Sequence, residues 1–214
     1  MTAIDLWRFV VDHRQELADL TWEHARLVVT ALALSVPVAV TVGVAVARRP
    51  ALANAAVGTA GVIFTIPSLA LFGLFVVPLG IGRAPAVTAL CLYALLPVLR
   101  NTVVGLSEVP AEVVEAARGM GMTESQALRR VRLPLALPVV VSGVRVAAVT
   151  AVGIATIAAL VAAGGLGVYV FDGLQTGDRT KTLAATLAVV VLALAVDGGL
   201  GLLERRLRRG RGEP

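Results

Sequence analysis

The stretch LVVTALALSVPVAVTVGVAVA runs from Leu27 to Ala47 and contains no Asp, Glu, Lys or Arg. It has 21 residues, and a helix needs roughly 20 to cross the apolar core of a bilayer. The rest of the chain has the same character, because 57% of its 214 residues are hydrophobic and only 15% are charged, whereas soluble domains have about 25% charged residues. The stretch therefore predicts an all-α integral membrane protein.

Further apolar runs extend from this first span toward the C-terminus. We predict five spans, at about residues 27–47, 52–77, 84–106, 142–165 and 182–203. The second run contains TIPSLALFG, in which Pro67 removes a backbone donor and is expected to kink or break the helix. One long broken span is our preferred interpretation of this run, and two shorter segments are the alternative. Five spans place the two termini on opposite sides of the membrane.

The basic residues indicate which side is cytoplasmic. With the C-terminus inside, 13 of the 19 basic residues fall on the inner side, and cytoplasmic loops carry an excess of Lys and Arg. We therefore predict an N-terminus outside and a C-terminus in the cytoplasm. The predicted order is an extracytoplasmic segment at 1–23, a membrane domain at 24–204 with a cytoplasmic loop at 107–139, and a basic cytoplasmic tail at 205–214.

The cytoplasmic loop contains the polar stretch EAARGMGMTESQALRRVRLP, from Glu115 to Pro134. A short helix with one apolar face is predicted at its start, because the spacing i, i+3, i+4, i+7 is followed by Val113, Ala116, Ala117 and Met120. Pro110 stands where such a helix begins. Gly121 stands where the helix must end and the chain must turn; if this residue adopts a left-handed conformation, only glycine fits there without strain.

A second helical stretch is predicted to follow. Thr123 and Gln126 have the spacing of a capping box, and we expect Pro134 and Pro138 to end the stretch before the fourth span. The residues by themselves leave two interpretations of the loop open. One is a surface on which another protein docks, and the other is a basic connector that lies on anionic lipid headgroups.

The spacing of four short sequence motifs in the loop favours the first interpretation, a surface on which another protein docks. Glu115, Ala116 and Ala117 are followed after three residues by Gly121, and after nine more by Val131, Leu133 and Pro134 in the order V-x-L-P. This spacing resembles the EAA loop of bacterial ABC importer permeases. The stretches TIPSLALFGLFVVPLGIG, ALLPVLRNTVVGL and GIATIAALVAAGGLG resemble the osmoprotectant branch of that family, which carries glycine betaine, carnitine, choline or related solutes such as proline.

The resemblance implies a five-span helical core of the MetI-like ABC permease type in a bacterial inner membrane. It also implies three protein partners: cytoplasmic ABC ATPase subunits, a second permease subunit that is identical or a paralogue, and an extracytoplasmic solute-binding protein. The ATPase would dock on the EAA loop, and we expect Ala116 and Ala117 to face it. No cofactor, metal or nucleic acid is implied.

Catalysis by the chain itself is not expected. The phosphate-binding motif G-x-x-x-x-G-K-[ST] is absent, since the one lysine is Lys181 and Thr180 precedes it. Both histidines, His13 and His24, precede the first apolar run, so no metalloprotease pair lies within a span. ATP hydrolysis is therefore assigned to a separate subunit. A permease for another small polar solute such as an amino acid, and a membrane scaffold that does not transport, are the alternatives.

Two further groups of residues are candidates for the transport pathway or a hinge. Broken membrane helices are tolerated where they face protein or a cavity, which makes pathway candidates of Thr65, Ile66, Pro67 and Ser68. Glycines near the end of the fourth span are close-packing sites or a hinge, namely Gly164, Gly165 and Gly167. Arg145 and Asp197 lie near cytoplasmic span ends, where we expect them to pair or to reach the headgroups.

Overall fold

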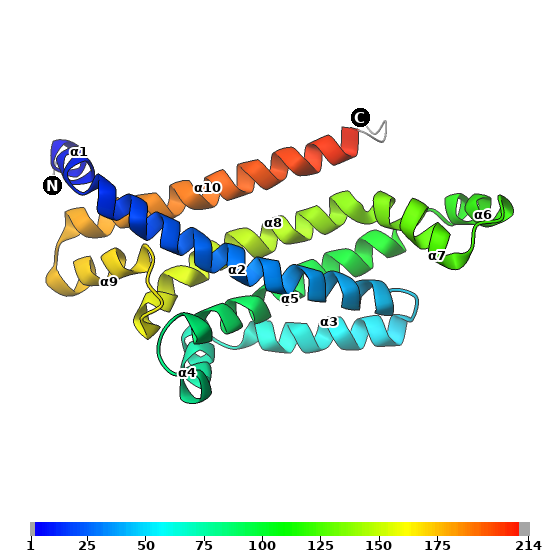
Figure 1. The fold of residues 1–214 in the computed structure, drawn as a ribbon, viewed down its shortest axis with the longest axis horizontal. Helices are drawn as coiled ribbons and strands as arrows, with labels where there is room; N and C mark the ends of the chain where they lie inside the picture. The colour runs from blue at the N-terminus through cyan, green and yellow to red at the C-terminus, as the bar shows by residue number, and fades with distance from the viewer. Residues whose placement is uncertain (1–2, 210–214) are drawn as a thin grey trace.

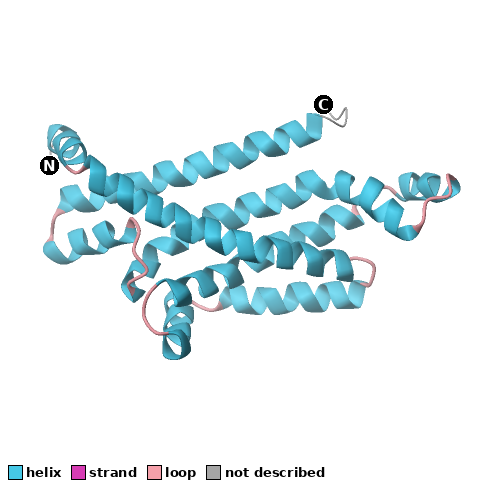
Figure 2. Cartoon of the chain, viewed as in Figure 1, coloured by secondary structure: helices cyan, strands magenta, loops and turns pink. Residues whose placement is uncertain are grey.

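The computed structural model describes residues 3–209, and within that range the chain consists of helices and connecting turns (Figure 2). Residues 1–2 of the predicted N-terminal segment and residues 210–214 of the predicted basic tail lie outside the described residues. The helices are α1 (Ala3–Asp12), α2 (Arg14–Val46), α3 (Pro50–Thr65), α4 (Ser68–Leu79), α5 (Arg83–Ser107), α6 (Ala111–Gly119), α7 (Glu124–Ala127), the π-helical turn η1 (Leu128–Arg132), α8 (Leu133–Ile157), the 3-10 turn η2 (Ala158–Val161), α9 (Gly167–Thr176) and α10 (Arg179–Arg209).

The long helices form a bundle with short helices at both ends (Figure 1). Within residues 3–209, four helices are long and apolar enough to cross a membrane, and α3 with α4 makes a fifth span if the bent pair is counted as one. Helix α5 is central, because it packs against α2, α3, α4 and α8. Helices α6 and α7 lie at one end of the molecule, and α1 and α9 lie at the other (Figure 1). The predicted all-α membrane fold is confirmed.

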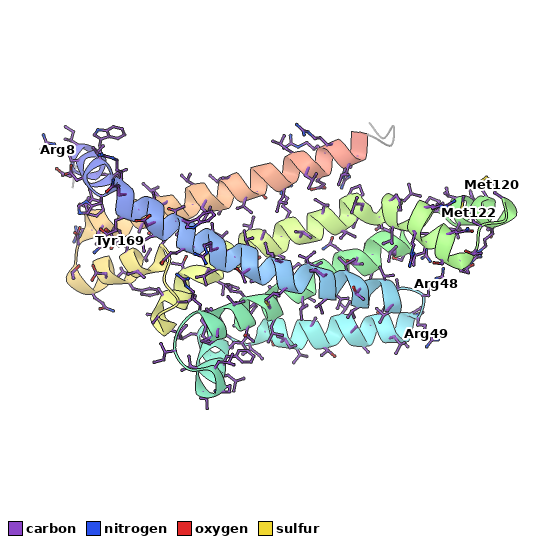
Figure 3. All side chains as sticks on the ribbon, viewed as in Figure 1. Arg8, Arg48, Arg49, Met120, Met122 and Tyr169 are labelled. Carbon is purple, nitrogen blue, oxygen red and sulfur yellow. The ribbon has the colours of Figure 1, made fainter. Side chains whose placement is uncertain are left out.

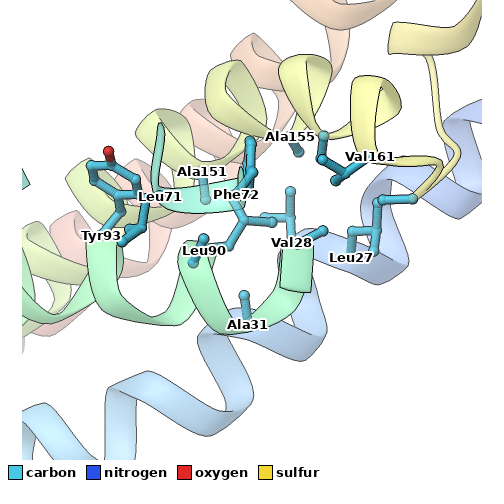
Figure 4. Packing of buried hydrophobic residues seen from close by; sticks show 14 of the residues in the cluster. Leu27, Val28, Ala31, Leu71, Phe72, Leu90, Tyr93, Ala151, Ala155 and Val161 are labelled. Carbon is cyan, nitrogen blue, oxygen red and sulfur yellow. The ribbon is translucent and has the colours of Figure 1, made fainter. Parts of the chain in front are cut away.

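Small side chains let the central helices approach closely. The main core combines Val28, Phe72 and Leu90 with alanines from three long helices (Figure 4). A Cβ atom added at Gly143 of α8 would lie 2.7 Å from the Pro97 carbonyl oxygen of α5. Lipid tails are as apolar as leucine, so membrane helices associate through close packing rather than through burial from water. Alanine and glycine at these contacts supply that packing.

The break predicted at Pro67 is present. Helix α3 ends at Thr65, helix α4 starts at Ser68, and the two are bent by 93°. Ile66 and Pro67 between them have extended backbone, with ψ of 129° and 133°. A proline ring clashes with a helical conformation of the preceding residue and offers no N–H to continue the ladder. The proline therefore explains the extended conformation of Ile66 before it.

The prediction that Pro134 and Pro138 end the second loop helix is wrong. The helix is continuous from Glu124 to Val161, over 38 residues. The turn η1 explains how it passes Pro134, because the Leu133 N–H donates to the Leu128 carbonyl, five residues back. This wider turn relaxes the ladder next to the proline. Pro138 is buried against neighbouring helices, where a missing bond is tolerated.

Arg145 and Asp197 pair with each other, one of the two outcomes expected for them. Arg145 of α8 donates from Nε and Nη2 to both carboxylate oxygens of Asp197 in α10, each at 2.6 Å. Glu204 lies 3.5 Å from Nη1 of the same arginine. A two-pronged arginine–carboxylate contact fixes orientation as well as charge. The pair therefore sets how α10 lies along α8.

Candidate functional site

Helix α6 ends in a turn that depends on Gly121. The Met122 N–H donates to the Ala117 carbonyl at 3.1 Å, and the Gly121 N–H donates to the Arg118 carbonyl at 2.9 Å. These two bonds define a Schellman motif, in which the residue after the helix adopts a left-handed conformation. Gly121 has φ of +81°. The left-handed conformation considered for this glycine is therefore present.

One apolar face of α6 is exposed. Val113 is 40% exposed and Met120 is 72% exposed, and Ala116 between them is also exposed. We call these three residues the α6 stripe. They are spaced i, i+3 and i+7, so they share one side of the helix. Met120 lies at an extremity of the molecule (Figure 3). This stripe is an unpartnered apolar surface at the end of the bundle.

The expectation that Ala116 and Ala117 both face outward is wrong for Ala117. Its side chain is only 1% exposed. Successive residues on a helix point about 100° apart, so Ala117 can point toward its own loop while Ala116 points away from it. Helix α6 packs against α7 and η1, and Ala117 is the buried residue of α6. A small side chain at 117 lets α6 lie close to the rest of its own loop.

Glu115 is exposed on α6. Within residues 3–209, no hydrogen bond or ion pair involves its carboxylate. An exposed carboxylate beside an apolar stripe is suited to meet a cationic or N–H donor on another protein. The geometry of this chain alone assigns Glu115 no structural task.

The other three residues of the predicted motif lie on the next element. Val131 belongs to η1, and Leu133 and Pro134 open α8. Leu133 packs against a small core that contains Leu106 and Ala136. Of the seven motif residues, three therefore lie in α6, Gly121 lies in the turn after it, and three lie at the start of the long helix, on which α6 packs.

Polar contacts fasten the base of the loop. The capping box predicted at Thr123 is confirmed, with its N–H donating to Gln126 Oε1 at 2.8 Å and its Oγ1 accepting from the Gln126 N–H at 3.3 Å. Arg118 of α6 donates from Nε to Glu124 Oε1 at 2.8 Å. Arg48, at the end of the first long helix, pairs with Oε2 of the same carboxylate. Sequence reasoning missed this ion pair, because its partners are far apart in the chain.

The break at Ile66 has a partner that sequence reasoning also missed. The hydroxyl of Tyr93 in α5 donates to the Ile66 carbonyl, which the end of α3 leaves without a helical partner. The Tyr93 ring is 4% exposed and meets Phe64 edge to face, with ring centroids 5.6 Å apart. The available signal was a tyrosine in an apolar span, since a buried hydroxyl requires an acceptor. Thr65 and Pro67 beside it are exposed, and Ser68 is half-buried.

The glycine-rich segment forms a tight turn after η2. Gly164 and Gly165 have φ of +86° and +80°. The Gly165 N–H donates to Glu23 Oε2 at 3.2 Å, which ties the turn to α2. A Cβ atom added at Gly167 would lie 2.0 Å from the Thr156 carbonyl oxygen. Of the two interpretations left open, close packing is the one that this backbone approach supports at Gly167.

Gly167→Ala is therefore expected to destabilise the protein by ~1–3 kcal/mol, the usual cost of overpacking a tight contact. Gly153→Ala is the matched control, because nothing lies within 4 Å of a Cβ added there and alanine favours a helix. The measurement is the melting temperature of each variant in detergent, followed by size-exclusion chromatography. Equal melting temperatures for the two variants would contradict the close approach seen at Gly167.

The fold and the projecting loop together define a multi-pass helical membrane protein with an exposed apolar stripe at one end. The sequence matches the family described as "Binding-protein-dependent transport system inner membrane component" over residues 35–209, and the chain belongs to that family.

Relatives of known role match almost the whole chain. The carnitine transport permease protein OpuCB of Listeria monocytogenes is 39% identical, over 93% of this chain and 91% of its own length. The osmoprotectant import permease protein OsmW of Salmonella typhimurium is 42% identical, over 91% and 93%. The choline transport system permease protein OpuBB of Bacillus subtilis is 38% identical, over 94% and 92%.

Solved structures agree with the fold. A chain of the methionine ABC transporter MetNI, crystallised in an inward-facing conformation, superposes with a TM-score of 0.77 at 25% identity. The match covers 97% of this chain and 99% of that one. A chain of an amino acid ABC transporter with histidines superposes with a TM-score of 0.72 at 20% identity, over 92% and 96%. The predicted permease fold and transport class are confirmed.

Proposed function

We propose that this permease works in an ABC importer whose ATP hydrolysis takes place on separate cytoplasmic subunits, and that these subunits dock on the α6 stripe. The observation that carries the proposal is the exposure of Val113, Ala116 and Met120 at the extremity of the bundle. Apolar residues on a projecting polar loop mark an interaction site more readily than a lipid contact. Glu115 beside the stripe supplies a charge for the same partner.

The long helix supplies a route from the docked subunit to the membrane. Helix α6 packs on α7 and η1, and these continue without interruption into α8. At 1.5 Å per residue, the 38-residue helix spans about 57 Å. Closure of the ATPase subunits on ATP would push α6, and the rigid helix would carry that displacement toward the glycine-rich turn. The pathway would then change the side that it faces.

The cytoplasmic side is proposed to be the α6 end. Arg48 and Arg49 lie at the same end as Met120 and Met122, whereas Tyr169 lies at the other end (Figure 3). The excess of arginine near α6 supports this orientation. This proposed orientation would place the N-terminus outside and the C-terminus in the cytoplasm. A solute-binding protein would then meet the α1 and α9 end, and a second permease would complete the pathway within the membrane.

The proposed cargo is a compatible solute of the betaine class, such as glycine betaine, carnitine, choline or proline. Relatives named for carnitine, osmoprotectants and choline support it, at 38–42% identity over nearly the full chain. An amino acid is the second candidate, because the structural neighbours are a methionine transporter and an amino acid transporter, at 20–25% identity. The higher identity favours the betaine class.

Uptake of radiolabelled glycine betaine tests this assignment. The chain is expressed, with the ATPase and binding protein encoded beside it, in cells that lack their own betaine uptake. We expect ATP-dependent uptake that excess unlabelled carnitine or choline inhibits and that excess methionine or histidine leaves unchanged. Inhibition by the amino acids alone would indicate that the cargo is an amino acid, the second candidate. Absence of uptake for every solute would favour the scaffold alternative.

A further inference from the structure

A single carboxylate joins three elements at the base of the loop. Glu124 is the first residue of α7. Its Oε1 accepts from Arg118 of α6 at 2.8 Å, and its Oε2 pairs with Arg48 near the end of α2. Each oxygen is thus held by an arginine from a different segment: Arg118 lies in α6, and Arg48 lies in the turn that follows α2. All three side chains are about half exposed, so they lie at the edge of the loop rather than in a core.

A second contact ties the same region to the end of α5. Arg132, the last residue of η1, donates from Nη2 to the Leu106 carbonyl at 3.0 Å. The start of the long helix is therefore fastened to α2 through Glu124 and to α5 through Arg132. Helix α6 is linked to its neighbours in the chain by Pro110 on one side and by the turn at Gly121 on the other. Polar contacts at Glu124 oppose a swing of α6 about these two points.

We propose that Glu124 is a positioning residue for energy coupling: it makes α6, α2 and the start of the long helix move as one unit when the ATPase acts. This inference rests on the proposed function. A single exposed ion pair contributes little to stability, but a carboxylate shared by two arginines fixes the relative orientation of their segments. With Glu124 in place, displacement of α6 reaches the first span as well as the fourth. Without it, part of that displacement is lost as rotation of α6.

The test separates coupling from docking. Glu124→Gln and Arg48→Gln are each co-expressed with the ATPase and binding protein, purified as the complex and reconstituted in vesicles. Three quantities are measured: the amount of ATPase that co-purifies, the rate of ATP hydrolysis, and the rate of radiolabelled glycine betaine uptake. Arg49→Gln is the matched control, because Arg49 is the exposed neighbour of Arg48 and no ion pair involves it within residues 3–209.

We expect Glu124→Gln to lower uptake per ATP hydrolysed by about fivefold, which corresponds to the loss of an exposed ion pair at the upper end of the usual strength. The ATPase should still co-purify with this variant. Arg48→Gln should show the same change to a smaller degree, because Arg118 still holds Glu124. Uptake per ATP hydrolysed should be no lower in the double variant than in Glu124→Gln, since Glu124→Gln already breaks the contact with Arg48. Arg49→Gln should match the unaltered complex.

Three results would overturn the inference. They are an unchanged ratio of uptake to hydrolysis in Glu124→Gln, an additive loss in the double variant, and an equal loss in Arg49→Gln. Failure of the proposed function is distinguishable from these, because it would show in the unaltered protein as absent ATPase association and absent ATP-dependent uptake.

Discussion

Gly121→Val is expected to abolish solute uptake while the chain still inserts into the membrane. Gly121 has φ of +81°, and a left-handed conformation costs an ordinary residue roughly 1–2 kcal/mol, with a β-branched side chain at the unfavourable extreme. The Schellman bonds that end α6 would then be lost or distorted, and the α6 stripe would be misplaced. The measurement is radiolabelled betaine uptake beside an immunoblot of the membrane fraction.

Two further variants distinguish backbone strain from other effects. Nothing lies within 4 Å of a Cβ added at Gly121, so added volume alone is not the cause of failure. Gly121→Asn should retain most uptake, because asparagine tolerates the left-handed conformation. Glu115→Lys should also abolish uptake, through charge reversal at the docking surface. Full uptake by Gly121→Val or Glu115→Lys, with normal insertion and ATPase association, would show that the loop is only a connector between two spans.

The second large effect concerns energy supply. The purified chain is expected to hydrolyse no ATP by itself, because the 214 residues contain no phosphate-binding G-x-x-x-x-G-K-[ST] motif. Hydrolysis should appear when an ABC ATPase subunit is added, and vesicle uptake should appear only with that subunit and ATP. The measurement is phosphate release from the chain, from the ATPase and from the two together. Robust release by a clean preparation of the chain alone would refute the division of labour.

The elements that could be predicted from sequence are those that local chemistry controls. The break at Pro67 was predicted from the chemistry of proline alone, which disfavours a helical conformation of the residue before it, and α3 does end there. The capping box at Thr123 is likewise confirmed, because its two partners are three residues apart. Gly121 adopts its left-handed conformation for the same local reason. The hydrophobic run at 27–47 identified a membrane helix from its length alone.

The features that could not be predicted depend on context. Pro134 resembles Pro67 in sequence, yet the helix continues past it through a wide π turn, because the helix is held on both sides of the proline. Ala117 faces inward because α6 packs on the rest of its own loop. The apolar spacing of α6 does not indicate which side of the helix makes this contact. The contact between Tyr93 and Ile66 and the ion pair between Arg48 and Glu124 join distant segments. The composition and the motif spacing of the sequence do not indicate which of these distant residues come into contact.

Docking of a cytoplasmic ATPase on the α6 stripe can be tested by crosslinking. The most direct test places a photo-crosslinking amino acid at Met120, which is 72% exposed, and in a separate variant at Leu174, which is 61% exposed. Leu174 belongs to α9, a helix at the end of the molecule opposite to α6 (Figure 1). Both variants are irradiated in intact cells, and adducts are identified by mass spectrometry. We predict that the Met120 variant forms an adduct with an ABC ATPase subunit and that the Leu174 variant forms none. An ATPase adduct at Leu174, or none at Met120 in cells that take up betaine, would contradict the account.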